Sequence, residues 1–215
     1  MSKKKNSVTD KTLLDEIHKT GFELEYRTSE VLRKSRWSVI NNKHYVDDQQ
    51  EKVREIDFVA YKMSKVGEMD IYTTLIISCK KSETKVWAFL AKNINTNDPN
   101  INWLPLSLWS NDKAVNFIRR QPKWEDSYFH RLKEFPVTNL ADTPGVHIFA
   151  FQEVDGKKTP NDGYIFDSIT SLMKAQAYEI ESLPQRKSNS CVYQFNLLSV
   201  VDADMREVLF GGEEP

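Results

Sequence analysis

The sequence predicts an α/β domain with a central mixed β-sheet flanked by helices. Apolar residues recur at helical spacing in two segments, 22–36 and 166–180, and several short apolar runs bounded by turn residues have the character of strands. Along the chain the order is helix, several strands, an irregular insertion, and then strand, helix and strand. This order is typical of an α/β domain with a mixed sheet.

Length and composition are those of a single globular domain. The 215 residues are enough for one full core carrying a surface insertion at about 93–140, and 40% of them are hydrophobic while 28% are charged. With 30 basic and 31 acidic residues, the chain would have to meet a nucleic acid through a local basic patch. No apolar run reaches membrane-spanning length and no apolar signal-peptide core follows the basic start, so we expect a cytoplasmic protein.

The N-terminal part is expected to hold two helices and the first strands. Thr9 or Asp10 can cap a short helix that ends before Gly21. The segment 22–36 predicts a stronger helix, with Glu25 at the edge of its apolar stripe. The strands predicted next occupy 37–40, 45–46 with a hairpin turn at 47–52, 53–61, 71–79 and 86–90.

The remainder predicts the insertion and then the rest of the sheet. Residues 93–111 are rich in asparagine and proline, which indicates an irregular surface segment, and 112–119 predict a short amphipathic helix. The elements predicted after the insertion are a strand at 146–151, a helix at 166–180, a long strand at 191–201 and a short strand at 207–210.

The cysteines and histidines indicate neither a disulfide nor a zinc site. Cys79 and Cys191 lie far apart, each in an apolar strand-like run, and predict buried free thiols. The four histidines share no spacing typical of metal ligands: His18, His44, His130 and His147.

A constellation of polar residues interrupts two of the apolar strands. Strand alternation puts Asp57 on the face of Glu55, and it puts Ser78 and Lys80 together on one face of the following strand. If the strands are neighbours, Asp57, Ser78 and Lys80 gather at one edge of the sheet, and a helix across that face would add Glu25.

These residue types suit the cleavage of phosphodiesters. A hard cation such as Mg²⁺, held by one or two carboxylates and by substrate oxygens, activates water and neutralises phosphate charge. Asp57 is the expected metal ligand, with the backbone carbonyl of Cys79 as a further one. Lys80 would orient the attacking water or neutralise the transition state.

The order of these motifs resembles the PD-(D/E)XK, or restriction-endonuclease-like, nuclease superfamily. The matching stretches are Gly21-Phe22-Glu23-Leu24-Glu25, Arg54-Glu55-Ile56-Asp57 and Ser78-Cys79-Lys80. The resemblance covers about residues 20–90 and implies a restriction-endonuclease-like core. By position it implies Glu25 as the helical acid, which joins Asp57 in holding Mg²⁺ or Mn²⁺, and Lys80 as the catalytic lysine.

Ser78 departs from this pattern, which has Glu or Gln at its position. A hydroxyl is a poorer ligand for Mg²⁺ than a carboxylate, so a second acid would have to come from Glu25, Glu55 or Glu83. The alternative is a degenerate site that binds nucleic acid or a protein without cutting. Asp57 alone could also serve a structural ion pair with Arg54 or Lys80.

Basic residues outside the motif are candidates for DNA contact. A tryptophan follows Arg119, Arg120 and Lys123, and such a mixture can bind a nucleic-acid backbone and stack on a base. Lys81, the residue after Lys80, is a further candidate. An ordinary solvated surface loop is the alternative for the run at 119–133.

Two functions are therefore expected from the sequence. The first is a Mg²⁺-dependent nuclease acting on DNA, which the resemblance connects with prokaryotic defence or DNA processing. The second is an inactive protein of the same fold that binds nucleic acid or another protein. The expected partner is DNA and not a membrane, with a second copy of the chain or another protein as a partner in assembly.

Overall fold

A six-stranded mixed sheet forms the centre of the protein in the computed structural model, which describes residues 9–47, 50–95, 97–98, 107–132, 145–156 and 163–211. The strands are β1 (Ser38–Asp47), β2 (Lys52–Val66), β3 (Met69–Asn93), β4 (Ser107–Ser110), β5 (Val146–Val154) and β6 (Cys191–Phe210). The helices are α1 (Asp10–Lys19), α2 (Phe22–Lys34), α3 (Lys113–Arg119), α4 (Trp124–Leu132) and α5 (Gly163–Arg186). This arrangement confirms the predicted α/β class with a mixed sheet and flanking helices.

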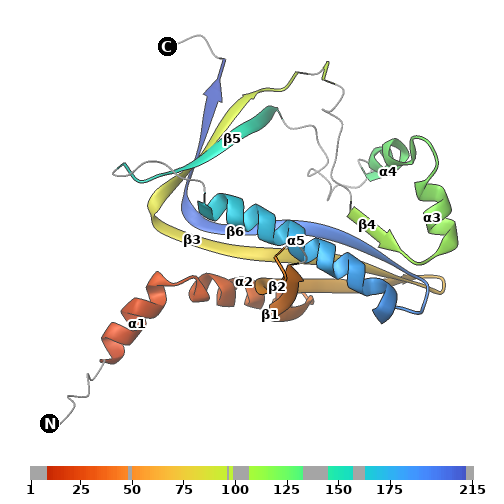
Figure 1. Ribbon diagram of the computed structural model, residues 1–215, viewed down its shortest axis with the longest axis horizontal. Coiled ribbons are helices and arrows are strands. Elements are labelled where there is room, and N and C mark those ends of the chain that lie inside the picture. The colour runs from red at the N-terminus through yellow and green to blue at the C-terminus, as the bar shows by residue number, and fades with distance from the viewer. Residues whose placement is uncertain are drawn as a thin grey trace.

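β3 is the strand around which the sheet is built. Its first half pairs antiparallel with β2 as far as Phe58–Ile77, and its second half pairs antiparallel with β5. On its other edge it runs parallel to β6, with an irregularity between Lys81 and Val86. The strand order is β1-β2-β3-β6-β4, and the sheet curls upward where β5 joins the far end of β3 (Figure 1).

Each face of this sheet is covered by one helix. α2 packs Leu24 and Leu32 against Phe58, Ile77 and Cys79. α5 lies across the other face (Figure 1), and its buried residues join a second core made of Tyr45, Ile56, Val59, Ile76, Leu172, Ala175, Leu183 and Phe195. Successive isoleucines of β3 thus serve opposite cores, as expected for a central strand covered on both sides.

Several strands that the sequence predicts as separate are continuous. The runs at 71–79 and 86–90 belong to β3, those at 191–201 and 207–210 to β6, and those at 37–40 and 45–46 to β1. Main-chain hydrogen bonds do not depend on apolar side chains, so the ladder of β6 continues through the polar residues between its runs, whereas that of β3 is interrupted between Lys81 and Val86. The predicted turn at 47–52 includes residues 48–49, which lie outside the described residues.

The insertion predicted at about 93–140 contains regular elements. The helix predicted at 112–119 is confirmed as α3, where the Asp112 carboxylate accepts from the backbone N–H groups of Ala114 at 2.8 Å and Val115 at 3.0 Å. β4 pairs antiparallel with β6, although 93–111 was predicted to be irregular, and the basic run continues into α4. Residues 99–106 and 133–140 lie outside the described part of the chain.

The predicted N-terminal helix is confirmed as α1. Thr9 caps it, with its hydroxyl oxygen accepting from the Thr12 backbone N–H at 3.2 Å. Leu13, Leu14 and Ile17, which share one side, are all exposed. Neither α1 nor any other helix within the described residues is both long and apolar enough to cross a membrane.

A buried glutamate fixes the start of α5. The Glu153 side chain of β5 is 0% exposed, and its carboxylate accepts from the backbone N–H groups of Tyr164 at 2.5 Å and Ile165 at 3.3 Å. Lys85 of β3 pairs with the same carboxylate at 2.6 Å. An acid at a helix N-terminus satisfies orphan N–H donors and the helix dipole together. This contact ties α5 to the sheet.

Glu153→Ala is expected to lower the free energy of unfolding by about 3 kcal/mol, because two helix N–H groups and a lysine lose a buried partner. The corresponding fall in Tm is roughly 6–12 °C. Thermal unfolding measured beside Glu181→Ala, an exposed position of α5, checks this. A Tm within about 2 °C of the control would show that Glu153 does not hold the helix.

Candidate functional site

The ladder between β2 and β3 ends at the predicted metal-binding acid. The last pair is Phe58–Ile77, and beyond it the Asp57 carboxylate accepts a hydrogen bond from the Cys79 backbone N–H at 2.5 Å. A side chain therefore takes the place of a main-chain acceptor at this point. It fixes Asp57 beside the segment that carries Ser78 and Lys80.

The regular alternation of β2 is interrupted at the same position. Ile56 belongs to the core under α5, while Phe58, two residues on, belongs to the core under α2. Residues two apart in a regular strand share a face, so the pleat breaks around Asp57. Asn42 stands opposite, between residues paired with Phe58 and Ile56, and its φ of 51° is a left-handed conformation that asparagine tolerates. Strand alternation along β2 therefore could not predict on which face of the sheet Asp57 lies.

α2 covers the face of Cys79 and not that of Ser78. The Cys79 thiol lies 3.9 Å from the Thr28 hydroxyl of α2. Ser78 is 2% exposed and falls on the opposite face by alternation, paired with Ser199 of β6. A helix does lie across the face of Ser78, but it is α5, so the prediction that this helix brings Glu25 is wrong. By the same alternation Lys80 shares the face of Ser78, and it is the charge of Lys80 that reaches Glu25 and Asp57. Ser78 is thus buried away from α2.

Glu25 nevertheless comes close enough to Asp57 for their charges to interact. Burial raises the pKa of the Glu25 carboxyl, and the negative charges of Asp57 and Glu55 raise it further, against a lowering by Lys80. Burial also raises the pKa of Asp57, while the Cys79 N–H and the Lys80 charge oppose the rise. The fold therefore gathers three acids and a lysine from α2, β2 and β3.

Within the described residues, Asp57 forms no ion pair. Arg54, one proposed partner, binds Asp47 instead, with its Nε 2.9 Å from Oδ2. Lys80, the other, has no carboxylate within ion-pair distance among the described residues, although its charge reaches Glu25 and Asp57. The structural ion-pair interpretation of Asp57 is wrong, and its fixed partner is a backbone N–H.

Two further acids were candidates for the second carboxylate. Glu55 is exposed, accepts a hydrogen bond from the Asn42 side chain and acts electrostatically on both Glu25 and Asp57. Glu83 is paired with Lys81 at 2.8 Å. Glu25 and Glu55 are therefore the acids that accompany Asp57.

This donor set suits a hard divalent cation held together with substrate. Among the described residues, no three His, Cys, Asp or Glu side chains are already arranged around one metal position. Mg²⁺, however, is commonly held by one or two carboxylates, with waters and substrate phosphates completing its shell. Glu25 and Asp57 have raised pKa values and form no ion pair with a lysine or arginine that the structure describes, which fits that use.

Both cysteines are free and buried, as predicted. Burial raises the pKa of the Cys79 thiol to about 12. Cys79 therefore stays protonated near neutral pH, and its side chain is neither a nucleophile nor a metal ligand.

The other basic residues lie away from Asp57. Arg119, Arg120 and Lys123 belong to α3 and the turn before α4, next to β4, so β3 and β6 separate them from β2 (Figure 1). Lys81 pairs with Glu83 and donates a hydrogen bond to the backbone carbonyl of His18, which anchors the end of α1. The basic run and the acid cluster are separate surfaces.

Two residues of the site had no place in the predicted motif. Thr28 lies one helical turn after Glu25 and touches Cys79, and Asn42 holds Glu55. Thr28 lies on the predicted apolar stripe of α2, so the sequence alone shows a hydroxyl among apolar residues there. Asn42 could be found only from its position opposite Asp57.

Comparison of the chain with protein-family models, with curated proteins and with solved structures finds no match.

Asp57→Asn is expected to raise the free energy of unfolding near pH 7 by roughly 0.5 kcal/mol, a value that allows for solvent screening. The folded protein raises the pKa of Asp57 above 3.8, so folding favours the neutral carboxyl. Above that raised pKa the charged carboxylate therefore destabilises the wild type relative to the variant. The difference in free energy of unfolding between the two proteins vanishes below about pH 4.

Urea unfolding from pH 3 to pH 8 measures this difference, with Asp15→Asn on the exposed face of α1 as the matched control. If the variant is less stable than the wild type at every pH, the hydrogen bond from the Cys79 N–H to charged Asp57 stabilises the protein by more than burial of that charge costs.

Proposed function

We propose that this chain is a Mg²⁺-dependent, cytoplasmic nuclease with a restriction-endonuclease-like core, which hydrolyses phosphodiester bonds of DNA. The observation that carries the proposal is that Glu25, on α2, comes within electrostatic reach of Asp57, on β2, and that the charge of Lys80, on β3, acts on both. Burial raises the pKa values of both acids; the charge of Asp57 raises that of Glu25 further, and the charge of Glu55 raises both. Perturbed carboxylates near a lysine are typical of catalytic sites.

The order of the elements supports the same proposal. Glu25 lies on a helix, Asp57 on a strand that follows it, and Lys80 on the next antiparallel strand. This is the order that the resemblance to the PD-(D/E)XK superfamily implies. α5 and β6, which follow, complete the sheet with a strand parallel to β3.

Asp57 and Glu25 would hold the cation, with the backbone carbonyl of Cys79 as a further ligand. Bound there, Mg²⁺ supplies a water of lowered pKa and charge that neutralises phosphate oxygens. The Cys79 N–H fixes one oxygen of Asp57 and leaves the other available. Lys80, without an ion-pair partner among the described residues, would place its ammonium group near the scissile phosphate. Glu55 would supply the acid that Ser78 does not.

Two observations favour the second function, a binding module without catalysis. The Asp57 carboxylate already accepts a short hydrogen bond, and a buried serine stands where the motif has Glu or Gln. A site with one acid fewer binds a divalent cation more weakly. The module would then bind nucleic acid through its cations without cleaving it.

Lys80→Met is expected to slow the cleavage of plasmid and single-stranded DNA in Mg²⁺ or Mn²⁺ by roughly 100-fold, because it removes charge that stabilises the transition state. Asp57→Asn, which keeps an acceptor for Cys79, is expected to lose cleavage to at least the same extent. Lys92→Met, an exposed position on the same strand, is the matched control.

Cleavage that survives both Lys80→Met and Asp57→Asn would place the activity elsewhere and overturn the nuclease proposal. DNA binding without cleavage in either metal would favour the binding module.

A further inference from the structure

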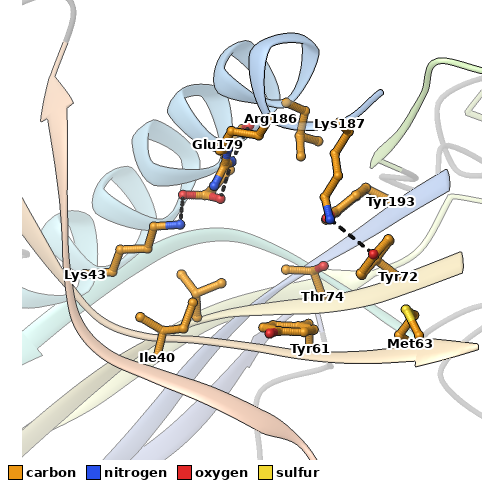
Figure 2. A pocket seen from close by; sticks show the side chains of 12 residues that line it. Ile40, Lys43, Tyr61, Met63, Tyr72, Thr74, Glu179, Arg186, Lys187 and Tyr193 are labelled. Carbon is orange, nitrogen blue, oxygen red and sulfur yellow. Dashed lines mark hydrogen bonds and ion pairs between the residues drawn. The ribbon is translucent and has the colours of Figure 1, made fainter. Parts of the chain in front are cut away.

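A cavity lies on the sheet face opposite α2, between that face and the C-terminal half of α5 (Figure 2). Its volume is about 440 Å³, within the range of small-molecule sites. β1, β2, β3 and β6 supply its floor and α5 its roof. None of the acids of the candidate active site lines it.

Three tyrosines from adjacent strands form one wall of the cavity. The rings of Tyr72 and Tyr193 are stacked, with centroids 4.4 Å apart and planes 13° apart. Tyr61 adds a third ring, whose centroid is 6.3 Å from that of Tyr72. All three project from the strands toward α5 (Figure 2). Because Tyr72 and Tyr193 already cover each other's facing sides, a flat aromatic ring would stack on the side of Tyr72 that faces Tyr61.

The charged residues of the cavity favour an anion. Glu179 is shared by two cations, Lys43 at 2.5 Å and Arg186 at 2.9 Å. Lys187 has no carboxylate within ion-pair distance among the described residues. It donates a hydrogen bond to the Tyr72 hydroxyl at 3.1 Å and lies 4.3 Å from the centre of that ring. Three cations against one acid leave an excess of positive charge over the aromatic wall.

A buried hydroxyl in the cavity has no partner. Thr74 is 3% exposed and lines the cavity, and its Oγ1 makes no hydrogen bond within the described part of the chain. Buried polar groups are nearly always hydrogen-bonded, so each exception calls for an explanation. A ligand with a hydrogen-bonding edge would satisfy this group.

We propose that this cavity binds a free nucleoside monophosphate, with its base on the tyrosine wall and its phosphate at Lys187. The Thr74 hydroxyl would bond to the base or the sugar. The site lies on the opposite face of β3 from Asp57 and Cys79 and does not depend on the proposed nuclease activity.

The experiment is calorimetric titration of the full chain with AMP, GMP, CMP and dTMP. At least one is expected to bind saturably with Kd below about 1 mM, while inorganic phosphate alone and the matching nucleoside alone bind at least about tenfold more weakly. A 5′-phosphorylated oligonucleotide distinguishes a free nucleotide from the end of a strand.

Variants connect the binding to this cavity. Lys187→Gln and Tyr72→Leu are each expected to weaken binding about tenfold or more, since they remove the charge and the stacking face. Thr74→Val is expected to weaken it severalfold while keeping or raising the Tm of the free protein, because it removes an unsatisfied hydroxyl. Lys113→Gln, exposed on α3 outside the cavity, should bind as the wild type does.

Three outcomes would overturn the proposal. The first is that no mononucleotide binds below the millimolar range. The second is equal affinity in the wild type, Lys187→Gln and Thr74→Val, with Tm values that show all three folded. The third is binding of the oligonucleotide alone.

Discussion

The main-chain ladder between β3 and β6 is the constraint on which the rest of the structure depends. The two strands are parallel, so no tight turn can join β3 to its partner, and the chain must cross over before returning as β6. α5 forms the last part of that connection and covers one face of the sheet, which leaves the other face to α2. The two covered faces thereby acquire different chemistry. The acids lie with α2, and the tyrosine-lined cavity lies under α5.

Five acidic residues in or near the core of the sheet divide into two groups by their partners. The side chains of Asp47, Glu153 and Glu179 are almost fully buried, and each pairs with lysine or arginine at 2.5–2.9 Å. These three hold α5 to the sheet. Glu25 and Asp57 have no such cation among the described residues, and burial raises their pKa values. Among the described residues, these two carboxylates therefore differ from the three that hold α5, and a bound cation at the proposed site would stabilise their charged forms.

The sequence predicts α1, α2, α3, α5 and every described strand except β4, because periodicity is a local property, whereas β4 and α4 were not predicted. Thr9 caps α1 as expected, and Cys79 and Cys191 are buried as expected. The continuity of β3 and β6 was not predictable in the same way, since it comes from pairing between distant strands. The face of Asp57 depends on a break in the pleat opposite Asn42. The cavity was not predictable either, because its wall depends on the stacking of Tyr72 on Tyr193. These residues are 121 positions apart (193 − 72), and the parallel register of β3 and β6 brings them together.

The most direct test of the central claim is a Mn²⁺ titration followed by electron paramagnetic resonance, which counts free ions without requiring a substrate. The wild type is predicted to bind one Mn²⁺ with Kd below about 1 mM. A Glu25→Gln, Asp57→Asn double variant that keeps its Tm should bind it at least about tenfold more weakly. Equal binding by the two proteins, or no binding by the wild type, would contradict the assignment of Glu25 and Asp57 as metal ligands.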